Sequence, residues 1–226
     1  MRNDPESRND PGFPWLTSDQ RFRFPDPESA GDGVVAVGGN LSPGMLLSAY
    51  SQGIFPWFSK DDPLLWWSPD PRFVIEIGEF RMPSRLERFM KQSPFVHRVD
   101  TAFEEVIRHC ASAKRPGQDG TWIQQDMVDA YCTLHREGYA HSVETWLDDK
   151  LVGGFYGVRL GDVFFGESMF SLVSEASKTA FCFFVRKFRD EGGALIDSQI
   201  YTDHIARFGG KNISRTAYLR MLSTFM

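Results

Sequence analysis

Three consecutive segments in the second half of the chain are largely apolar and are separated by short polar turns. Residues 141–147, 151–158 and 163–170 are rich in β-branched and aromatic side chains. Asp148-Asp149 and Leu160-Gly161-Asp162 separate them and have the composition of hairpin turns. The pattern therefore predicts an antiparallel meander of three strands.

Helices and further strands are predicted on both sides of the meander. Apolar residues recur at helical spacing in three segments, 102–113, 125–137 and 176–190. Ser174 is placed to cap the last of these helices. Short apolar runs over 72–77 and 194–199 predict two buried strands. These elements predict an α+β fold with a mixed, largely antiparallel sheet flanked by helices.

The N-terminal part of the chain has a different pattern. Its first 33 residues are rich in Pro, Asp, Ser and Gly, so few regular elements are expected there. Ser42-Pro43 begins a short helix that ends at Gly53. Residues 54–72 hold four prolines and three tryptophans, and so much proline argues against a helix or a central strand.

The length of 226 residues fits one large core with a smaller appended lobe. We place the boundary at Pro71, so that residues 1–71 form a small N-terminal lobe and residues 72–226 a larger domain. The net charge of -5 argues against a protein that coats nucleic acid through bulk positive charge. A local basic patch remains compatible with that charge.

The composition does not point to secretion or to a membrane. The N-terminus has no apolar signal-like region, and no run of about 18 uncharged apolar residues occurs. Cys110, Cys132 and Cys182 are widely spaced and odd in number, which is typical of reduced thiols. We expect a cytoplasmic protein.

A basic cluster follows the predicted strand over 72–77. Ser84 and Glu87 have the spacing of a capping box that opens a helix. On that helix Arg85, Arg88 and Lys91 share one face. Such a face is often merely solvated, but in an acidic chain it is also the density of charge that a nucleic-acid backbone needs.

Polar side chains interrupt two apolar strands. Glu167 lies in FFGESMF, and Asp197 and Gln199 lie in LIDSQI. Burying a carboxylate costs several kcal/mol unless it is paired. Asp197 and Gln199, two apart on a strand, are expected to face the same side. The three residues form either a hydrogen-bond network that ties the fold together or a reaction centre.

Aromatic residues form two further groups. Phe155, Phe164, Phe181, Phe184 and Phe188 would converge if the 176–190 helix packs on the meander, as ordinary core or as the wall of an apolar pocket. The second group is a pair of tryptophans. Trp57 stands in a loop made rigid by proline, and Trp122 stands near a glycine. Both positions suit an exposed ring on which a base could stack, and both also suit a ring buried in the core.

Six motifs occur in one order and resemble signatures of the leucyl/phenylalanyl-tRNA-protein transferases. They are GGNLSPGMLLSAYSQGIFPWFS (38–59), LLWWSPDPR (64–72), GTWI (120–123), GESMFS (166–171), ASKTA (176–180) and LIDSQ (195–199). The resemblance covers roughly residues 35–210. It implies a small N-terminal lobe and a larger domain similar to the acetyl-CoA-dependent N-acetyltransferase (GNAT) fold.

The resemblance also implies roles for the residues singled out above. Trp57 and Trp122 would hold the 3′-terminal adenosine of a charged tRNA, and Arg85, Arg88 and Lys91 would contact its backbone. The apolar side chain of the transferred amino acid would lie among Phe155, Phe164, Phe184, Phe188 and Ile196. The reaction centre would hold Asp197 and Gln199, with Glu167 beside it. Position 155 departs from the family, where a slimmer Met is expected, and Thr202 replaces an expected Asn.

The implied activity transfers Leu or Phe, with Met as a further substrate, from aminoacyl-tRNA to the α-amine of proteins that begin with Arg or Lys. Such transfer marks them for degradation by the N-end rule. The ester is already activated, so no cofactor is expected, and we expect a monomer. The proton of the amine could pass through Asp197 and Gln199 or through a ribose hydroxyl of the tRNA.

Two other functions stay open. An acetyl-CoA-dependent N-acetyltransferase would need a pyrophosphate-binding loop, and no RxxGxG/A-like stretch precedes a helix. A noncatalytic tRNA- or peptide-binding module would account for the aromatic residues and the basic face. It would leave Asp197 and Gln199 without a role.

Overall fold

Two β-sheets organise the chain, a small one near the N-terminus and a large one in the rest. The computed structural model describes residues 12–59, 62–113 and 122–226. The small sheet has the order β1-β3-β2 and the large one the order β10-β4-β9-β8-β7-β6-β5. β8 and β9 run parallel, and the other pairs of neighbours are antiparallel. The α+β prediction with a mixed, largely antiparallel sheet is confirmed.

The strands are β1 (Val34–Val37), β2 (Phe55–Pro56), β3 (Leu65–Trp67), β4 (Arg72–Glu76), β5 (Val96–Val99), β6 (Ala140–Leu147), β7 (Lys150–Leu160), β8 (Val163–Ser171), β9 (Leu195–Asp197) and β10 (Lys211–Ile213). The helices are α1 (Pro43–Ser51), α2 (Ser84–Gln92), α3 (Phe103–Ser112), α4 (Gln125–Arg136), α5 (Ala176–Asp190), α6 (Asp203–Ala206) and α7 (Arg215–Phe225), with short 3-10 turns η2 (Pro27–Ser29) and η3 (Ile77–Glu79). The meander and its two turns lie where the β-branched and aromatic segments and the polar turn residues placed them.

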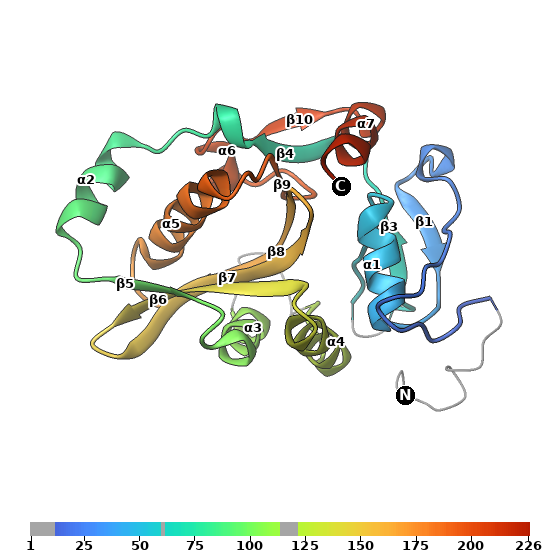
Figure 1. Ribbon diagram of the computed structural model, residues 1–226, viewed down its shortest axis with the longest axis horizontal. Helices are drawn as coiled ribbons and strands as arrows, with labels where there is room; N and C mark the ends of the chain where they lie inside the picture. Colours follow the sequence, from blue (N-terminus) through green and yellow to red (C-terminus); the bar gives the residue numbers. More distant parts are fainter. Residues whose placement is uncertain (1–11, 60–61, 114–121) are drawn as a thin grey trace.

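Helices cover both faces of the large sheet (Figure 1): α5 lies on one face, and α3 and α4 lie on the other. Neighbouring residues of β7 show the division, because successive side chains of a strand point to opposite faces. Phe155 packs against Phe181 of α5, whereas Tyr156 packs against Phe103 of α3 and Tyr131 of α4.

Glycine lets α5 approach the sheet closely. A Cβ atom at Gly153 of β7 would lie 2.6 Å from the Cβ of Ala176 and 3.0 Å from the backbone nitrogen of Ser177, at the start of α5. Real Cβ atoms do not approach so closely, so a larger residue here would push α5 away. The approach matters because α5 supplies one wall of the cavity described below.

Three local expectations were wrong. Leu65–Trp67 does form the central strand of the small sheet, since its neighbouring prolines lie just outside the three paired residues. Ser84 and Glu87 form no capping box, because Pro83 takes the N-cap position and Ser84 is already helical. Ser174 does not cap α5, whose N-cap is Glu175 in the left-handed conformation.

The small sheet and α1 form one hydrophobic core with the α3 and α4 side of the large sheet. Eight of the nine α1 residues are buried, so this helix is enclosed on all sides. The boundary at Pro71 falls between the last strand of the small sheet and the first strand of the large one, and it stays a proposal.

Candidate active site

A cavity of about 320 Å³ opens where β8 and β9 separate. The two strands pair only from Val163 to Phe165 of β8, while β8 continues to Ser171. β9 ends at Asp197, so no described strand covers this edge of β8 beyond Phe165. The lining residues are Phe55, Pro56, Trp57, Trp122, Phe155, Tyr156, Phe164, Gly166, Glu167, Ser168, Met169, Phe181, Ile196, Ser198, Gln199, Ile200, Thr202, His204 and Ile205.

The apolar part of the cavity is built from β7, β8, β9 and α5. Phe155, Phe164, Phe181 and Ile196 line it, and all four are buried side chains. Phe155 makes edge contacts with Phe164 and Phe181, with ring centroids 6.0 Å and 5.9 Å apart. The structure therefore brings together most of the aromatic cluster that the sequence singled out.

Two predicted pocket residues lie behind this wall. Phe184 packs against Phe155 and Phe164, at 5.4 Å and 4.4 Å between centroids, and does not line the cavity. Phe188 stacks on Phe184 at 5.3 Å and is fully buried. Phe184 and Phe188 lie four apart on one face of α5. They pack against the residues that line the cavity and so support its wall from the side away from the cavity.

Trp57 and Trp122 stand at the cavity wall on the side of the small lobe. Trp57 is 36% exposed, and Trp122 is half-buried. The indole Nε1 of Trp67 donates to the backbone oxygen of Trp57 at 2.7 Å, and the two rings lie 5.8 Å apart. Trp57 is thus a presented ring on a fixed backbone. Gly120 and Thr121 of the GTWI motif lie outside the described residues.

Asp197, at the end of β9, is fully buried and fully paired. Arg72 of β4 donates to both carboxylate oxygens, with Nε to Oδ1 at 2.9 Å and Nη2 to Oδ2 at 2.6 Å. The Tyr218 hydroxyl of α7 also donates to Oδ2, at 2.7 Å. Burial lowers the pKa of the Arg72 guanidinium, but the charge of Asp197, the influence of Tyr218 and the hydrogen bonds to both together raise that pKa above its ordinary value. The bidentate geometry is the strongest form of such a pair.

Asp197 and Gln199 do not lie on one regular strand, so the expectation that they face the same side is wrong. The strand ends at Asp197, and Gln199 adopts a left-handed backbone with φ 57°. The backbone N–H of Gln199 donates to Asp197 Oδ1 at 2.9 Å. The side-chain Nε2 of Gln199 instead donates to Glu167 Oε1, at 3.3 Å. In a regular strand, side chains two positions apart lie on the same face. The turn after Asp197 breaks this pattern and directs the two side chains to different partners.

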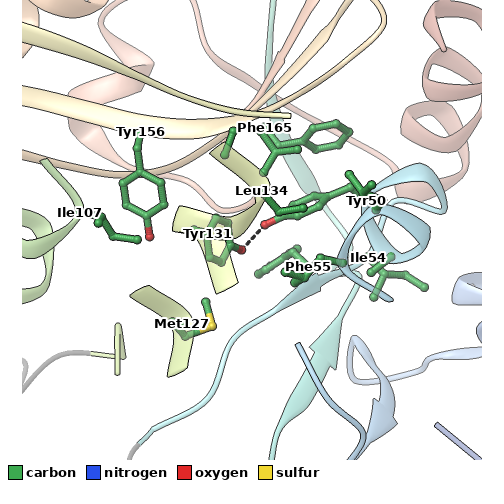
Figure 2. Packing of buried hydrophobic residues seen from close by; sticks show 14 of the residues in the cluster. Tyr50, Ile54, Phe55, Ile107, Met127, Tyr131, Leu134, Tyr156 and Phe165 are labelled. Atoms are coloured by element: carbon green, nitrogen blue, oxygen red, sulfur yellow. Dashed lines mark hydrogen bonds between the residues drawn. The ribbon is translucent and has the colours of Figure 1, made fainter. Parts of the chain in front are cut away.

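Glu167 of β8 lies half-buried in the cavity wall beside Gln199. The Tyr50 hydroxyl of α1 donates to Oε1 at 2.7 Å, and the Tyr131 hydroxyl of α4 donates to Oε2 at 3.1 Å. Those two hydroxyls also contact each other, as Figure 2 shows. Burial raises the pKa of the Glu167 carboxyl to about 7, although the tyrosine hydrogen bonds oppose the shift.

The predicted basic face is placed apart from the cavity. Arg85, Arg88 and Lys91 lie on α2, and Figure 1 shows α2 and the small lobe at opposite ends of the long axis of the molecule. Lys91 forms an exposed ion pair with Glu87 at 3.5 Å. A contact of this face with a tRNA backbone stays a prediction.

Sequence reasoning missed Arg72, Tyr50, Tyr131 and Tyr218. A signal was present for Arg72, since a charged side chain in the apolar run RFVIEI needs a buried partner. The tyrosines gave a weaker signal, because a buried Tyr hydroxyl usually has a hydrogen-bond partner but the sequence does not name it. His204 of α6 also lines the cavity, and burial lowers its pKa.

Within the described residues, no group of three or more His, Cys, Asp or Glu side chains is arranged to hold a metal ion. The same part of the chain contains no helix that is long and apolar enough to cross a membrane. The described cavity offers an apolar wall, two indole rings, and the polar side chains of Gln199 and Glu167. Such a site suits a ligand with an apolar side chain, a flat ring and a polar centre.

The sequence matches two family models along most of its length. Residues 74–223 match the family described as leucyl/phenylalanyl-tRNA protein transferase. Residues 39–70 match the N-terminal domain of the same family.

Individual relatives agree with these matches. A leucyl/phenylalanyl-tRNA–protein transferase of Myxococcus xanthus is 50% identical over 214 residues, covering 94% of this chain and 92% of the relative. A protein of the same name from Anaeromyxobacter sp. (strain K) is 51% identical over 201 residues, covering 88% and 86%. Among solved structures, a GCN5-related N-acetyltransferase from Kribbella flavida is 12% identical with a TM-score of 0.35, covering 76% of this chain and 62% of that one.

Proposed function

The chain belongs to the leucyl/phenylalanyl-tRNA protein transferase family, and from that premise we propose that it transfers leucine or phenylalanine from charged tRNA to a protein. The acceptor is the α-amine of a protein that begins with Arg or Lys, and the product is marked for degradation by the N-end rule. The enzyme acts in the cytoplasm as a monomer, without a cofactor.

One observation carries this proposal. A single cavity is lined by the ring-presenting Trp57 and Trp122, by an apolar aromatic wall, and by the polar side chains of Gln199 and Glu167. An aminoacyl-adenosine has the matching parts: a base that stacks on indole rings, an apolar side chain, and an ester carbonyl between the two.

The residues then have the following roles. Trp57 and Trp122 hold the terminal adenosine, and the apolar side chain lies against Phe155, Phe164 and Ile196. Phe184 and Phe188 act from behind, because they fix the orientation of that wall. The α2 residues Arg85, Arg88 and Lys91 contact the tRNA backbone. These contacts position the tRNA and do not read its sequence.

Gln199 orients the attacking amine. Its Nε2 is directed to Glu167, so its Oε1 is left to accept an N–H of the amine. Asp197 fixes the backbone of Gln199, and Arg72 neutralises the charge of Asp197. The amine nitrogen bonds to the ester carbonyl carbon, the bond from that carbon to the ribose oxygen breaks, and a proton is placed on the departing oxygen. Since the ester is reactive by itself, most of the rate enhancement comes from positioning.

A transfer assay tests the proposal. The protein is mixed with Leu-charged tRNA and a peptide that begins with Arg, and the peptide mass is followed without acetyl-CoA. We expect the mass of one leucyl residue to be added. The same peptide with an acetylated N-terminus, or with Ala first, is expected to stay unmodified or nearly so.

The same assay separates the two other functions. An N-acetyltransferase would modify the peptide only after acetyl-CoA is added, and by the mass of an acetyl group. A binding module would retain charged tRNA or peptide and add nothing to either. Either result would contradict aminoacyl transfer.

A further inference from the structure

The carboxyl of Glu167 and the hydroxyls of Tyr50 and Tyr131 form a closed ring of three contacts. Each hydroxyl contacts one carboxyl oxygen, and the two hydroxyls contact each other (Figure 2). Every one of these contacts needs one proton to be a hydrogen bond. The two phenols supply two protons, so the ring lacks one when Glu167 is ionised. A third proton, on the carboxyl, completes the ring.

We infer that this ring is the proton acceptor of the transfer reaction, with Glu167 as the catalytic base and Tyr50 and Tyr131 as its positioning residues. The inference rests on the proposed function and names the group that activates the amine. Glu167 lies in the cavity wall beside Gln199, where the amine is to be oriented.

Asp197 is a poor alternative as the base. Its side chain has 0% exposure, and Arg72 and Tyr218 occupy its oxygens together with the backbone N–H of Gln199. Asp197 also does not line the cavity in which the amine is to be placed. Glu167 has no cation within ion-pair distance among the described residues, and it keeps access to the cavity.

The surroundings of Glu167 bring its pKa close to that of the α-amine of the acceptor. Tyr50, Tyr131 and Gln199 contact it from α1, α4 and the loop after β9, and the charges of Asp197 and Arg72 act on it from β9 and β4. His204 faces the same cavity from α6. The resulting pKa of Glu167 is about 7, and that of a free α-amine is about 8. A proton can therefore pass between them with only about a tenfold disadvantage.

The step balances as follows. The acceptor ammonium gives one proton to Glu167 and becomes a neutral amine. Its nitrogen then forms the amide bond with the ester carbonyl carbon. The second proton of that nitrogen goes to the ribose oxygen as the ester bond breaks. Glu167 afterwards releases its proton to solvent, and the net products are the amide, the tRNA hydroxyl and one proton.

The test is the pH profile of a single turnover with saturating charged tRNA and peptide. We expect Glu167→Gln to transfer Leu about 100-fold or more slowly at pH 7, with an unchanged KM for charged tRNA. Tyr50→Phe and Tyr131→Phe remove a donor to the carboxylate, which raises its pKa. Their acid limbs are expected to move up by about one pH unit. Tyr139→Phe, a partly buried tyrosine outside this cavity, is the matched control.

The two tyrosine variants separate positioning from mere packing. Positioning predicts rates that converge with wild type above the shifted limb, because Glu167 is then ionised in every variant. A loss of equal size at every pH would overturn the role of the tyrosines. A Glu167→Gln enzyme within about twofold of wild type would overturn the inference entirely. If wild type itself transfers nothing, the proposed function fails instead.

Discussion

Two carboxylates on neighbouring strands, Asp197 of β9 and Glu167 of β8, have opposite surroundings. Asp197 meets a guanidinium, whereas the donors that contact Glu167 among the described residues are neutral: two phenols and an amide. The comparison teaches that burial alone does not tell whether a carboxylate is structural or reactive. The charge of its partner decides, because a cation fixes the ionised form and a neutral donor leaves it free to take a proton.

The two sites also tie the fold together differently. Arg72 donates to the Gly53 carbonyl at the end of α1 as well as to Asp197, so this pair joins the small lobe to the large sheet. Tyr50 joins the same helix to Glu167. Both carboxylates therefore hold α1 in place, one through an ion pair and the other through a neutral hydrogen bond.

The largest expected effect is the loss of the ion pair. Asp197→Asn leaves the buried Arg72 guanidinium without its counter-charge, so the free energy of unfolding should fall by about 3–5 kcal/mol. Urea unfolding measures it. Glu167→Gln is the matched change, and it should cost far less because no cation is left behind. Equal losses in the two variants would remove the distinction between the two sites.

The two tryptophans of the cavity wall are expected to affect the binding of charged tRNA independently of the carboxylates. Trp57→Ala and Trp122→Ala should each weaken the use of charged tRNA by about 1–3 kcal/mol, through KM more than kcat. Steady-state kinetics with varied charged tRNA gives both constants. Trp15→Ala, an exposed tryptophan outside the cavity, is the control. If a variant keeps the wild-type KM for charged tRNA, the replaced ring packs against its neighbours and does not bind the tRNA.

Side-chain preference should respond to the apolar wall and not to either carboxylate. Phe155→Ala makes room beside Phe164 and Phe181, so the ratio of Phe to Leu transfer should rise, by about 2 kcal/mol at most. Competition between the two charged tRNAs measures the ratio. Phe89→Ala, on the exposed side of α2, serves for comparison. An unchanged ratio in a folded variant would take Phe155 out of the pocket.

A further expected effect concerns stability and pH. The pKa of Glu167 is about 7 in the folded chain, against an ordinary value of 4.5. Between these values the folded state binds more protons, so wild type loses stability as pH rises, by about 3 kcal/mol over the whole range. Glu167→Gln removes this loss. Urea unfolding at pH 5 and pH 8 compares the two proteins, and parallel changes would show that Glu167 does not titrate in this range.

Local sequence determined most of the elements. Runs of β-branched and aromatic residues and the turn residues between them fixed the β6, β7 and β8 meander, and apolar periodicity fixed α3, α4 and α5, since these signals lie within each segment. β5 was missed, because its two central residues, His97 and Arg98, are polar and interrupt the apolar pattern. The caps of α2 and α5 were misread, because Pro83 and Glu175 fix the start of each helix through backbone geometry.

For the site, the sequence by itself determined which residues were out of place: Glu167, Asp197 and Gln199 stood in apolar strands and needed a reason. Only the tertiary structure decided what each one does. Arg72 lies 125 positions from Asp197, and Tyr50 lies 117 positions from Glu167. No local pattern encodes a partner at such a distance. The state of a buried carboxylate depends on the charge that folding brings beside it, so only the assembled sheet and helices could separate the ion pair from the proton acceptor.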